Sequence, residues 1–381
     1  MIKSVKRILV LTWAISVICL IALKCYKNLF KAIKGIHGIF VFRKKMNRFN
    51  KLPKYYHANK RYFMTMNIPG FPSESFNRFI SIELNKSLPF QKDSSDLQLA
   101  VLSITSRCPM HCLHCYEWER INGNEYLTLE QLLEIQRRIE KYGVSQIQYS
   151  GGEPMIRINE LTELIKATLS TTDTWVFSSG YNFKIENVLR LKQAGLTGIV
   201  LSLDHWKPEG HNHLRQSDRS FDWVSEAARQ IVRADLALSL SLCATRDFVN
   251  RENLLNYVVY ARNLKAGFIQ ILEPRKVGHF KNSDVELYPD QINLINDFVN
   301  EMNNHPKYSD MPTILFPGYH QREFGCFGGG DRFLYIDSKG NLNACPFCQE
   351  SAGSCLDNDL TLLINNLKAK GCPKFPKVPA F

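Results

Sequence analysis

The stretch CPMHCLHCY, residues 108–116, places three cysteines and two histidines within nine positions. Its cysteines are spaced C-x3-C-x2-C and therefore supply three thiolates from one short segment. A structural zinc site or an electron-transfer 4Fe-4S cluster is commonly held by four protein ligands. The spacing therefore favours a metal centre with one open coordination position. A zinc site completed by His111 or His114 is the alternative interpretation.

This stretch follows the first of six predicted repeats of one strand and one helix. From residue 98 to about residue 272, short apolar runs alternate with amphipathic segments of helical period. Such alternation predicts parallel strands with right-handed crossovers, so the expected fold class is α/β, a partial (β/α)6 barrel. Chemistry in these folds lies at the carboxyl ends of the strands. Cys108, Gly151 and Asp204 fall at or just beyond predicted strand ends.

The positive charge of the chain is concentrated in an N-terminal arm. Residues 1–61 hold fifteen Lys and Arg and no acidic residue, whereas the remaining residues hold 33 basic and 36 acidic side chains. The body is therefore mildly acidic, which argues against a nucleic-acid-binding face on it, and no nucleic-acid partner is expected.

Within this arm, residues 8–23 form an uncharged apolar run flanked by Arg7 and Lys24. As a helix the run spans about 24 Å, and its basic flanks can extend toward a bilayer core of about 30 Å. No small-x-small cleavage site follows, so the run predicts a membrane anchor and not a cleaved signal.

A basic amphipathic segment follows the apolar run. Four lysines recur there at helical spacing, opposite Phe30 and Ile33, which is typical of a segment lying on an anionic membrane surface. These lysines are Lys24, Lys27, Lys31 and Lys34. The excess of basic residues on this flank favours a cytoplasmic body. We therefore predict a single-pass protein of the cell membrane whose catalytic body is cytoplasmic, and clustered cysteines in such a body indicate metal binding instead of disulfides.

The C-x3-C-x2-C loop, with His114 before its third cysteine, resembles the signature of the radical S-adenosylmethionine (SAM) enzymes. YSGGEP, residues 149–154, resembles that family's second motif, and LSLD, residues 201–204, resembles its ribose-contacting segment. The resemblance covers roughly residues 98–280. GFIQILE and FSSGY match the family's later motifs only in part, because Ile271 stands where a glycine is usual and FSSGY departs from T-N-G.

The resemblance implies a 4Fe-4S cluster held by Cys108, Cys112 and Cys115, whose open iron chelates SAM. Electron transfer would then cleave SAM to a 5′-deoxyadenosyl radical. The implied SAM contacts come from the cluster loop and from two strand ends, and no catalytic residue is predicted beyond the cluster. These contacts are His114, Tyr116, Gly151, Gly152, Glu153, Ser202 and Asp204.

The C-terminal cysteines resemble the SPASM and twitch extensions of the same family, which carry an auxiliary iron-sulfur cluster. A predicted hairpin, FLYI and NLNA joined by DSKG, brings the ends that carry Cys326 and Cys345 together. A predicted helix of roughly 18 Å separates Cys355 from Cys372, so both cannot serve one small cluster. We favour Cys326, Cys345, Cys348 and Cys372, with Cys355 as the alternate. A zinc ribbon on the same four residues stays open.

Four regions follow from these patterns. They are a transmembrane anchor with a basic amphipathic segment (1–45), a linker or lid (46–97), a radical SAM core (98–300) and a SPASM/twitch-like domain (301–381).

The predicted function is radical modification of a lipid or other membrane-associated substrate. The alternatives are maturation of a ribosomal peptide, or a non-catalytic membrane-bound iron-sulfur electron carrier or zinc module. The expected cofactors are SAM, the SAM-binding 4Fe-4S cluster and a second 4Fe-4S cluster. The expected partners are the membrane, a reducing protein such as a flavodoxin or ferredoxin, and a lipid, peptide or small-molecule substrate.

Overall fold

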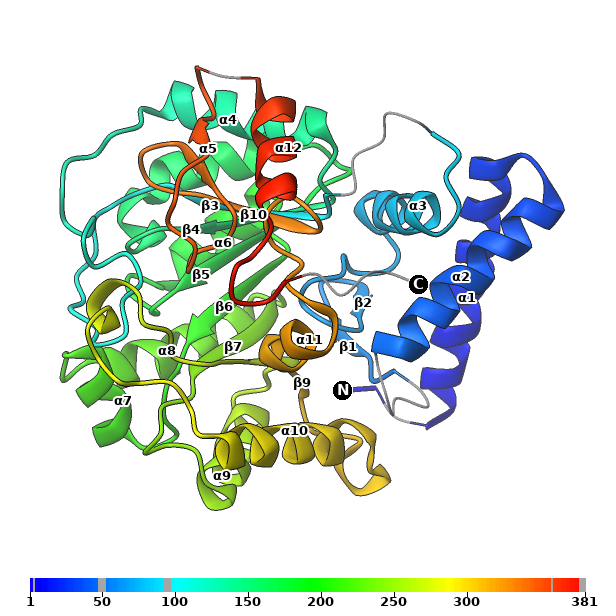
Figure 1. Cartoon of the computed structure of the whole chain (residues 1–381). Helices are drawn as coiled ribbons and strands as arrows, with labels where there is room; N and C mark the ends of the chain where they lie inside the picture. Colours follow the sequence, from blue (N-terminus) through cyan, green and yellow to red (C-terminus); the bar gives the residue numbers. More distant parts are fainter. Residues whose placement is uncertain (3, 47–52, 92–96, 358, 377–381) are drawn as a thin grey trace.

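The computed structural model of the chain describes residues 1–2, 4–46, 53–91, 97–357 and 359–376 (Figure 1). Its centre is a parallel sheet in the order β10-β3-β4-β5-β6-β7-β8-β9, extended beyond β10 by the antiparallel strands β11 and β12. The predicted partial (β/α)6 barrel is confirmed. Its six strands are β3 (Leu99–Ser103), β4 (Gln146–Ser150), β5 (Asp173–Ser178), β6 (Gly198–Ser202), β7 (Ala237–Cys243) and β8 (Phe268–Leu272).

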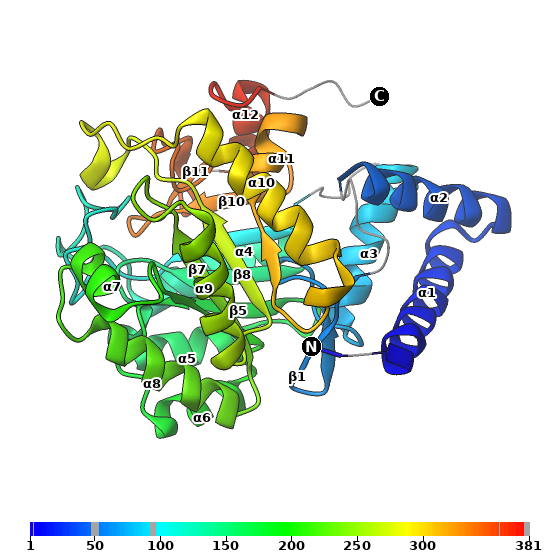
Figure 2. The same ribbon diagram turned by 90° about the horizontal axis from the view of Figure 1, so that it is seen from below.

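Helices cover the outer face of this sheet (Figures 1 and 2). Apolar side chains of strands and helices meet in one buried cluster that includes Ile147, Leu240, Leu132 and Ile231, all fully buried. Each such side chain contributes about 1.5–3 kcal/mol on burial. The helices are α4 (Leu129–Tyr142), α5 (Ile158–Ala167), α6 (Ile185–Ala194), α7 (Pro208–Arg215), α8 (Ser220–Arg233) and α9 (Arg251–Asn263), together with the 3-10 turn η1 (Pro154–Arg157).

The C-terminal region extends the sheet at both edges. Strand β9 (Thr313–Leu315) pairs with β8, and β10 (Phe333–Ile336) pairs with β3 at the opposite edge. Strands from the predicted core and from the predicted C-terminal domain therefore belong to one sheet. The other elements of this region are η2 (Gly278–Phe280), α10 (Pro289–Asn304), η3 (Pro306–Tyr308), α11 (Pro317–Phe324), β11 (Asn341–Asn343), β12 (Gly353–Ser354) and α12 (Leu360–Lys370).

The inner face of the sheet is plugged toward the amino-terminal ends of its strands. The hairpin of β1 (Tyr56–Ala58) and β2 (Arg61–Phe63) inserts Phe63 there, and Met66 follows. These side chains pack against Trp175 and Phe268 from the sheet. The plug fills the barrel at the amino-terminal ends of its central strands.

The segment predicted as a linker or lid holds a regular helix, α3 (Glu74–Ser87), in its described part. Its prolines do not interrupt the helix, because Pro72 precedes the N-cap Ser73 and Pro89 follows the last turn. The expectation of a linker or lid did not include this helix of 14 residues. Residues 47–52 and 92–96 of this region lie outside the described residues.

Two N-terminal helices, α1 (Ser4–Tyr26) and α2 (Leu29–Met46), lie beside α3 on one flank of the molecule (Figures 1 and 2). Ala22 and Tyr26 of α1 pack against Phe76 and Leu84 of α3. Val5–Tyr26 is long and apolar enough to cross a membrane. The apolar run predicted from the sequence is thus helical, and it also contacts the folded body.

Candidate active site

The cysteine loop follows β3 and packs directly on the GGE segment that follows β4. Gly152 N donates to Thr105 O at 2.8 Å, and Glu153 N donates to Arg107 O at 2.7 Å. A Cβ atom on Gly152 would lie 2.2 Å from Arg107 O. The second glycine is therefore required for close approach of the two loops, a packing reason beside the predicted role of this segment in binding SAM.

Glu153 is buried, and both of its carboxylate oxygens are occupied by protein donors. Its Oε1 accepts from Ser178 Oγ at 2.8 Å and from Met155 N at 3.1 Å. Its Oε2 accepts from the backbone N of Ser179 at 2.8 Å and from that residue's hydroxyl at 2.6 Å. Burial raises the pKa of Glu153, and these donors oppose the rise. The carboxylate thus ties the end of β4 to the end of β5, and the contact of Glu153 with SAM stays a prediction.

Asp204, just after β6, anchors the cysteine loop from the other side. Its Oδ2 lies 2.9 Å from His114 Nε2 and accepts from Arg215 Nε at 2.7 Å, and its Oδ1 accepts from Cys243 N at 3.0 Å. Although burial disfavours the charged form, Arg215 and His114 hold the pKa of Asp204 well below its ordinary value. Both oxygens are thus engaged by protein donors, and the ribose contact of Ser202 or Asp204 stays a prediction.

Arg215, at the end of α7, also reaches the cluster loop itself. Its Nη1 donates to Cys112 Sγ at 3.6 Å. Burial raises the pKa of the Cys112 thiol, and the guanidinium opposes that rise. Burial also raises the pKa of Cys115 to about 12. Because metal ligation requires the thiolate, the positive charge of Arg215 supports ligation at Cys112.

The turn η2, after β8, covers the carbonyl groups of the cysteine loop. His279 N donates to Cys115 O at 2.9 Å, and His279 Nδ1 lies 2.9 Å from Cys112 O. The ring of this histidine stacks on Trp118 at 3.9 Å between centroids. Sequence reasoning missed both His279 and Arg215. The sequence signal for Arg215 is its place in a polar run, residues 211–222, that follows the LSLD segment.

A cavity of about 1300 Å³ lies at the carboxyl-terminal side of the barrel. Its wall includes nine of the ten residues predicted for the cluster and SAM, namely Cys108, Cys112, His114, Cys115, Tyr116, Gly151, Gly152, Ser202 and Asp204. Glu153 is not part of this wall. The residues present fit a cluster with SAM, because three thiols from one loop border the same open space as the glycine segment and Ser202.

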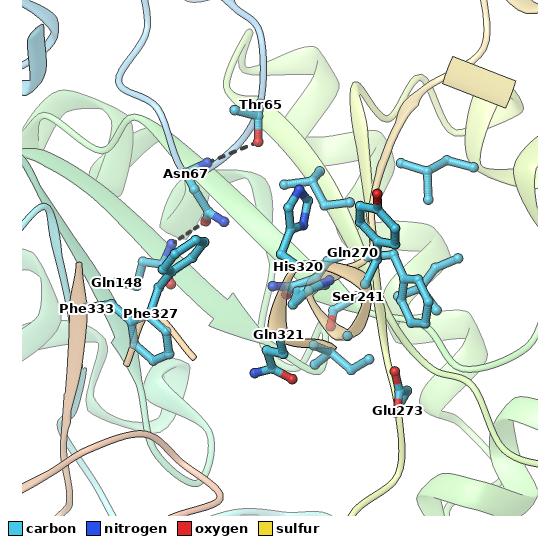
Figure 3. A pocket seen from close by; sticks show the side chains of 18 of the residues that line it. Thr65, Asn67, Gln148, Ser241, Gln270, Glu273, His320, Gln321, Phe327 and Phe333 are labelled. Atoms are coloured by element: carbon cyan, nitrogen blue, oxygen red, sulfur yellow. Dashed lines mark hydrogen bonds between the residues drawn. The ribbon is translucent and has the colours of Figure 1, made fainter. Parts of the chain in front are cut away.

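The floor of this cavity is polar (Figure 3). Gln148 Nε2 donates to Asn67 Oδ1 at 3.3 Å, and Ser241 and Gln270 lie on neighbouring strands. Within the described residues, Gln270 Oε1 is buried and has no hydrogen-bond partner. A buried unpaired carbonyl oxygen is costly, so this atom is suited to accept a hydrogen bond from a ligand.

The part of the cavity wall formed by the N-terminal helices is mainly apolar, with Arg43 of α2 as its basic member. Ile18 comes from α1, and Ile39, Phe40 and Met46 come from α2. Arg332 links α2 to the C-terminal cysteine region, since its guanidinium lies 4.6 Å from the Phe42 ring centroid. The helices predicted as a membrane anchor therefore also form part of the wall of the candidate active site.

The structure brings four of the five C-terminal cysteines together. The thiols of Cys345 and Cys348 interact, and Cys326 and Cys348 both interact with Cys372. Cys345 also borders the large cavity. Among the described residues, no three Cys, His, Asp or Glu side chains are arranged to hold a single metal ion. Thiolates of a 4Fe-4S cluster bind different irons and do not need that arrangement.

Cys355 lies apart from these four. It is buried in the main apolar cluster, and its carbonyl oxygen accepts from Arg138 Nη1 at 2.9 Å. Its position before α12, with Cys372 after that helix, agrees with the argument from helix length. Helix α12 begins at Leu360 with Asp359 as its N-cap.

Comparison with known proteins identifies the family. The sequence profile described as the radical SAM superfamily matches residues 102–252. A PqqA peptide cyclase from Granulibacter bethesdensis is 30% identical over 258 residues, which are 66% of this chain and 68% of that protein. A probable GTP 3′,8-cyclase from Methanocella arvoryzae is 29% identical over 179 residues, 45% of this chain and 55% of that protein. The chain thus spans little more than half the length of the Methanocella arvoryzae protein.

Solved structures share the fold. Streptococcus suis SuiB bound to the precursor peptide SuiA superposes with a TM-score of 0.57 at 14% identity, over 78% of this chain and 71% of that one. SuiB bound to SAM superposes with a TM-score of 0.54 at 15% identity, over 73% and 67%. The profile matches the part of the chain that carries the three-cysteine loop and the glycine segment. The chain belongs to the radical SAM superfamily.

Proposed function

We propose that this radical SAM enzyme modifies an amphiphilic lipid, or another membrane-associated substrate, in the cavity beside Cys108, Cys112 and Cys115. When bound, the 4Fe-4S cluster and SAM supply a 5′-deoxyadenosyl radical that removes a hydrogen atom from the substrate. The observation that carries the proposal is the continuity of one cavity from these cysteines to the exposed helices α1 and α2.

The two ends of the cavity match the two ends of an amphiphile. Ile39 and Phe40 of α2 offer an apolar wall for a hydrocarbon chain. Gln148, Ser241 and Gln270 offer amide and hydroxyl groups to a polar part of the substrate. Because a site built from hydrogen-bonding groups rejects ligands that lack partners for them, this floor should orient the substrate and select it.

Each predicted cofactor residue has a role in this proposal. Gly151, Gly152, Tyr116 and Ser202 border the space for SAM. The remaining three, His114, Glu153 and Asp204, hold the cysteine loop and strand ends in position. We propose that these three residues keep the cluster and the substrate at a fixed distance and orientation relative to each other.

Cys326, Cys345, Cys348 and Cys372 are proposed to hold an auxiliary 4Fe-4S cluster. The interactions among their thiols support this set over one that includes Cys355. The reductant is proposed to be a flavodoxin or ferredoxin, and the location is proposed to be the cell membrane with the catalytic body in the cytoplasm. The apolar helix Val5–Tyr26 supports that location.

A ribosomal peptide is the second candidate substrate. It is favoured by the similarity to a PqqA peptide cyclase and by the fold shared with SuiB, which binds a precursor peptide in its crystal structure. A peptide maturase should change the mass of a small partner peptide. A lipid-modifying enzyme should instead change the lipid composition of the cells that contain it.

The test begins with anaerobic reconstitution of the full chain with iron, sulfide, SAM and dithionite. The enzyme should form 5′-deoxyadenosine, and Cys112→Ala should abolish it, whereas Cys355→Ala should not. Lipid extracts and small peptides from cells with the protein and without it are then compared by mass spectrometry. A changed lipid supports the proposal. An unchanged lipid profile with a changed peptide would replace it by the second candidate, and absence of 5′-deoxyadenosine would favour the non-catalytic carrier or zinc module.

A further inference from the structure

We propose that α1 and α2 dock in the plane of an anionic membrane, within one leaflet, and that α1 does not cross the bilayer. This inference rests on the membrane location in the proposed function, but not on the chemistry of the substrate. It revises the predicted single-pass anchor.

Both ends of α1 are attached to the same folded body. At its start, Ile2 N donates to Tyr55 O at 2.8 Å, and Arg7 Nε donates to Pro53 O at 2.8 Å. At its end, the Tyr26 hydroxyl donates to Leu84 O at 2.7 Å. Pro53 and Tyr55 directly precede the hairpin of β1 and β2, whereas Leu84 belongs to α3.

These attachments conflict with a membrane-spanning α1. At 1.5 Å per residue, Arg7 and Tyr26 are about 28 Å apart, which is close to the thickness of a bilayer core. A spanning α1 would therefore place Pro53 and Leu84 on opposite sides of the membrane. The polar backbone of the body between them would lie in hydrocarbon, where lipid-exposed irregular backbone is not tolerated.

Helix α1 is also not a helix that is buried in the core of a soluble domain. Only 22% of its apolar window is buried. Large apolar side chains are exposed along one flank formed by α1 and α2, with Phe30 exposed to 82%. The exposed residues are Val5, Ile8, Leu9, Trp13, Ile15, Leu20 and Leu23 on α1, and Leu29, Phe30, Ile33, Phe40 and Val41 on α2. An exposed apolar flank of this extent marks an interaction surface.

The charges beside this flank identify its partner as an anionic lipid surface. The last turn of α2 carries the exposed basic residues Lys44 and Lys45. Lys24 lies in the last turn of α1, Lys31 and Lys34 lie on α2, and residues 1–61 contain no acidic side chain. Basic residues beside an apolar helical face are typical of helices that lie in the interface of anionic membranes.

This arrangement places the apolar end of the cavity at the membrane surface. Phe40 is both exposed and part of the cavity wall. A substrate held in the same leaflet could then enter between α1 and α2 without leaving an apolar environment. The same two helices would therefore dock on the membrane and line the entrance to the active site.

Membrane topology tests the inference in cells that express the full chain with an N-terminal epitope tag. In-plane docking predicts that protease removes the tag only from inverted membrane vesicles, together with digestion of the body. A spanning α1 predicts that protease removes the tag from intact spheroplasts while the body stays protected, and that result would overturn the inference. This readout is independent of product formation, so failure of the proposed lipid chemistry would leave it unaffected.

Vesicle binding by the purified holoenzyme gives a second test. Vesicles of phosphatidylglycerol and phosphatidylcholine should sediment the protein, and the double variant Phe30→Glu, Ile33→Glu should bind at least about tenfold more weakly. The matched control is Leu362→Glu, which alters an exposed leucine on α12. Circular dichroism verifies the helical content of all three proteins. Equal binding by the double variant, or no binding by the unaltered protein, contradicts the docking surface.

Discussion

Arg215 donates one hydrogen bond to the buried carboxylate of Asp204 and another to the thiol of Cys112, at 2.7 and 3.6 Å. It thereby joins the end of β6 to the middle cysteine of the cluster loop. Both side chains of the ion pair are nearly inaccessible to solvent, with exposures of 10% and 1%. The charge of this arginine therefore acts at short range on the cluster site.

Replacing this arginine should weaken both the fold and the cluster. Arg215→Ala leaves the Asp204 carboxylate without its buried cationic partner, which should cost about 3–5 kcal/mol of unfolding free energy. Iron content and the absorbance of the reconstituted cluster should fall with it. The control Arg229→Ala removes the exposed pair with Glu226 and should cost less than about 1 kcal/mol. Full iron content in Arg215→Ala would show that the arginine does not support the cluster.

The glycine segment gives a prediction about loop packing. In Gly152→Ala the new Cβ would lie 2.2 Å from Arg107 O, so the cysteine loop must move. Overpacking of this kind costs about 1–3 kcal/mol, and the displaced loop should bind less iron and form less 5′-deoxyadenosine. Iron analysis and thermal unfolding measure the two effects. Unchanged values for both would contradict the proposed close packing of the two loops.

The polar floor of the cavity gives a prediction about the substrate. Gln270→Leu removes the unpaired amide but keeps the approximate side-chain volume, so formation of 5′-deoxyadenosine without substrate should persist. Turnover of substrate should fall about tenfold, the equivalent of one lost hydrogen bond of about 1.4 kcal/mol. The control Gln230→Leu alters a glutamine of the outer helix α8 whose Oε1 also has no partner among the described residues. Equal losses in both variants would argue against a substrate contact at Gln270.

The auxiliary site gives a prediction about metal content. Two 4Fe-4S clusters correspond to about eight iron ions per chain. Cys372→Ala should lower this value toward about four, because this thiol interacts with Cys326 and Cys348. Cys355→Ala should leave it unchanged, since Cys355 lies in the apolar cluster. The reverse result would exchange the roles of the two cysteines, and about one zinc ion per chain would indicate a zinc ribbon.

Local patterns predicted the core of the fold. The six strands and the helices between them follow from apolar periodicity, and the cysteine loop follows from spacing within eight residues. The helix α3 escaped prediction because its neighbouring prolines resemble interruptions, although Pro72 and Pro89 lie outside it. The hairpin of β1 and β2, which fills the amino-terminal end of the barrel, was not predicted. Its packing partners, including Trp175 and Phe268, lie more than 100 residues away in the sequence.

The supporting contacts of the site could not be read from spacing. The sequence predicts Asp204 and Glu153 as SAM contacts, but it does not reveal the protein donors that occupy their oxygens. Arg215 and His279 are distant from the cysteines in sequence and reach them only through the fold. A hydrogen-bond network of this kind depends on three-dimensional proximity and has no periodic signature.

The transfer of deuterium from a perdeuterated membrane lipid extract into 5′-deoxyadenosine tests the central claim most directly. The reconstituted enzyme is incubated anaerobically with SAM, reductant and vesicles of that extract, and the nucleoside is analysed by mass spectrometry. If the cavity beside Cys108, Cys112 and Cys115 receives a lipid, the nucleoside should gain deuterium. The account would be contradicted if 5′-deoxyadenosine forms but stays unlabelled with every lipid fraction. In that case the nucleoside would gain deuterium from a deuterated peptide pool instead.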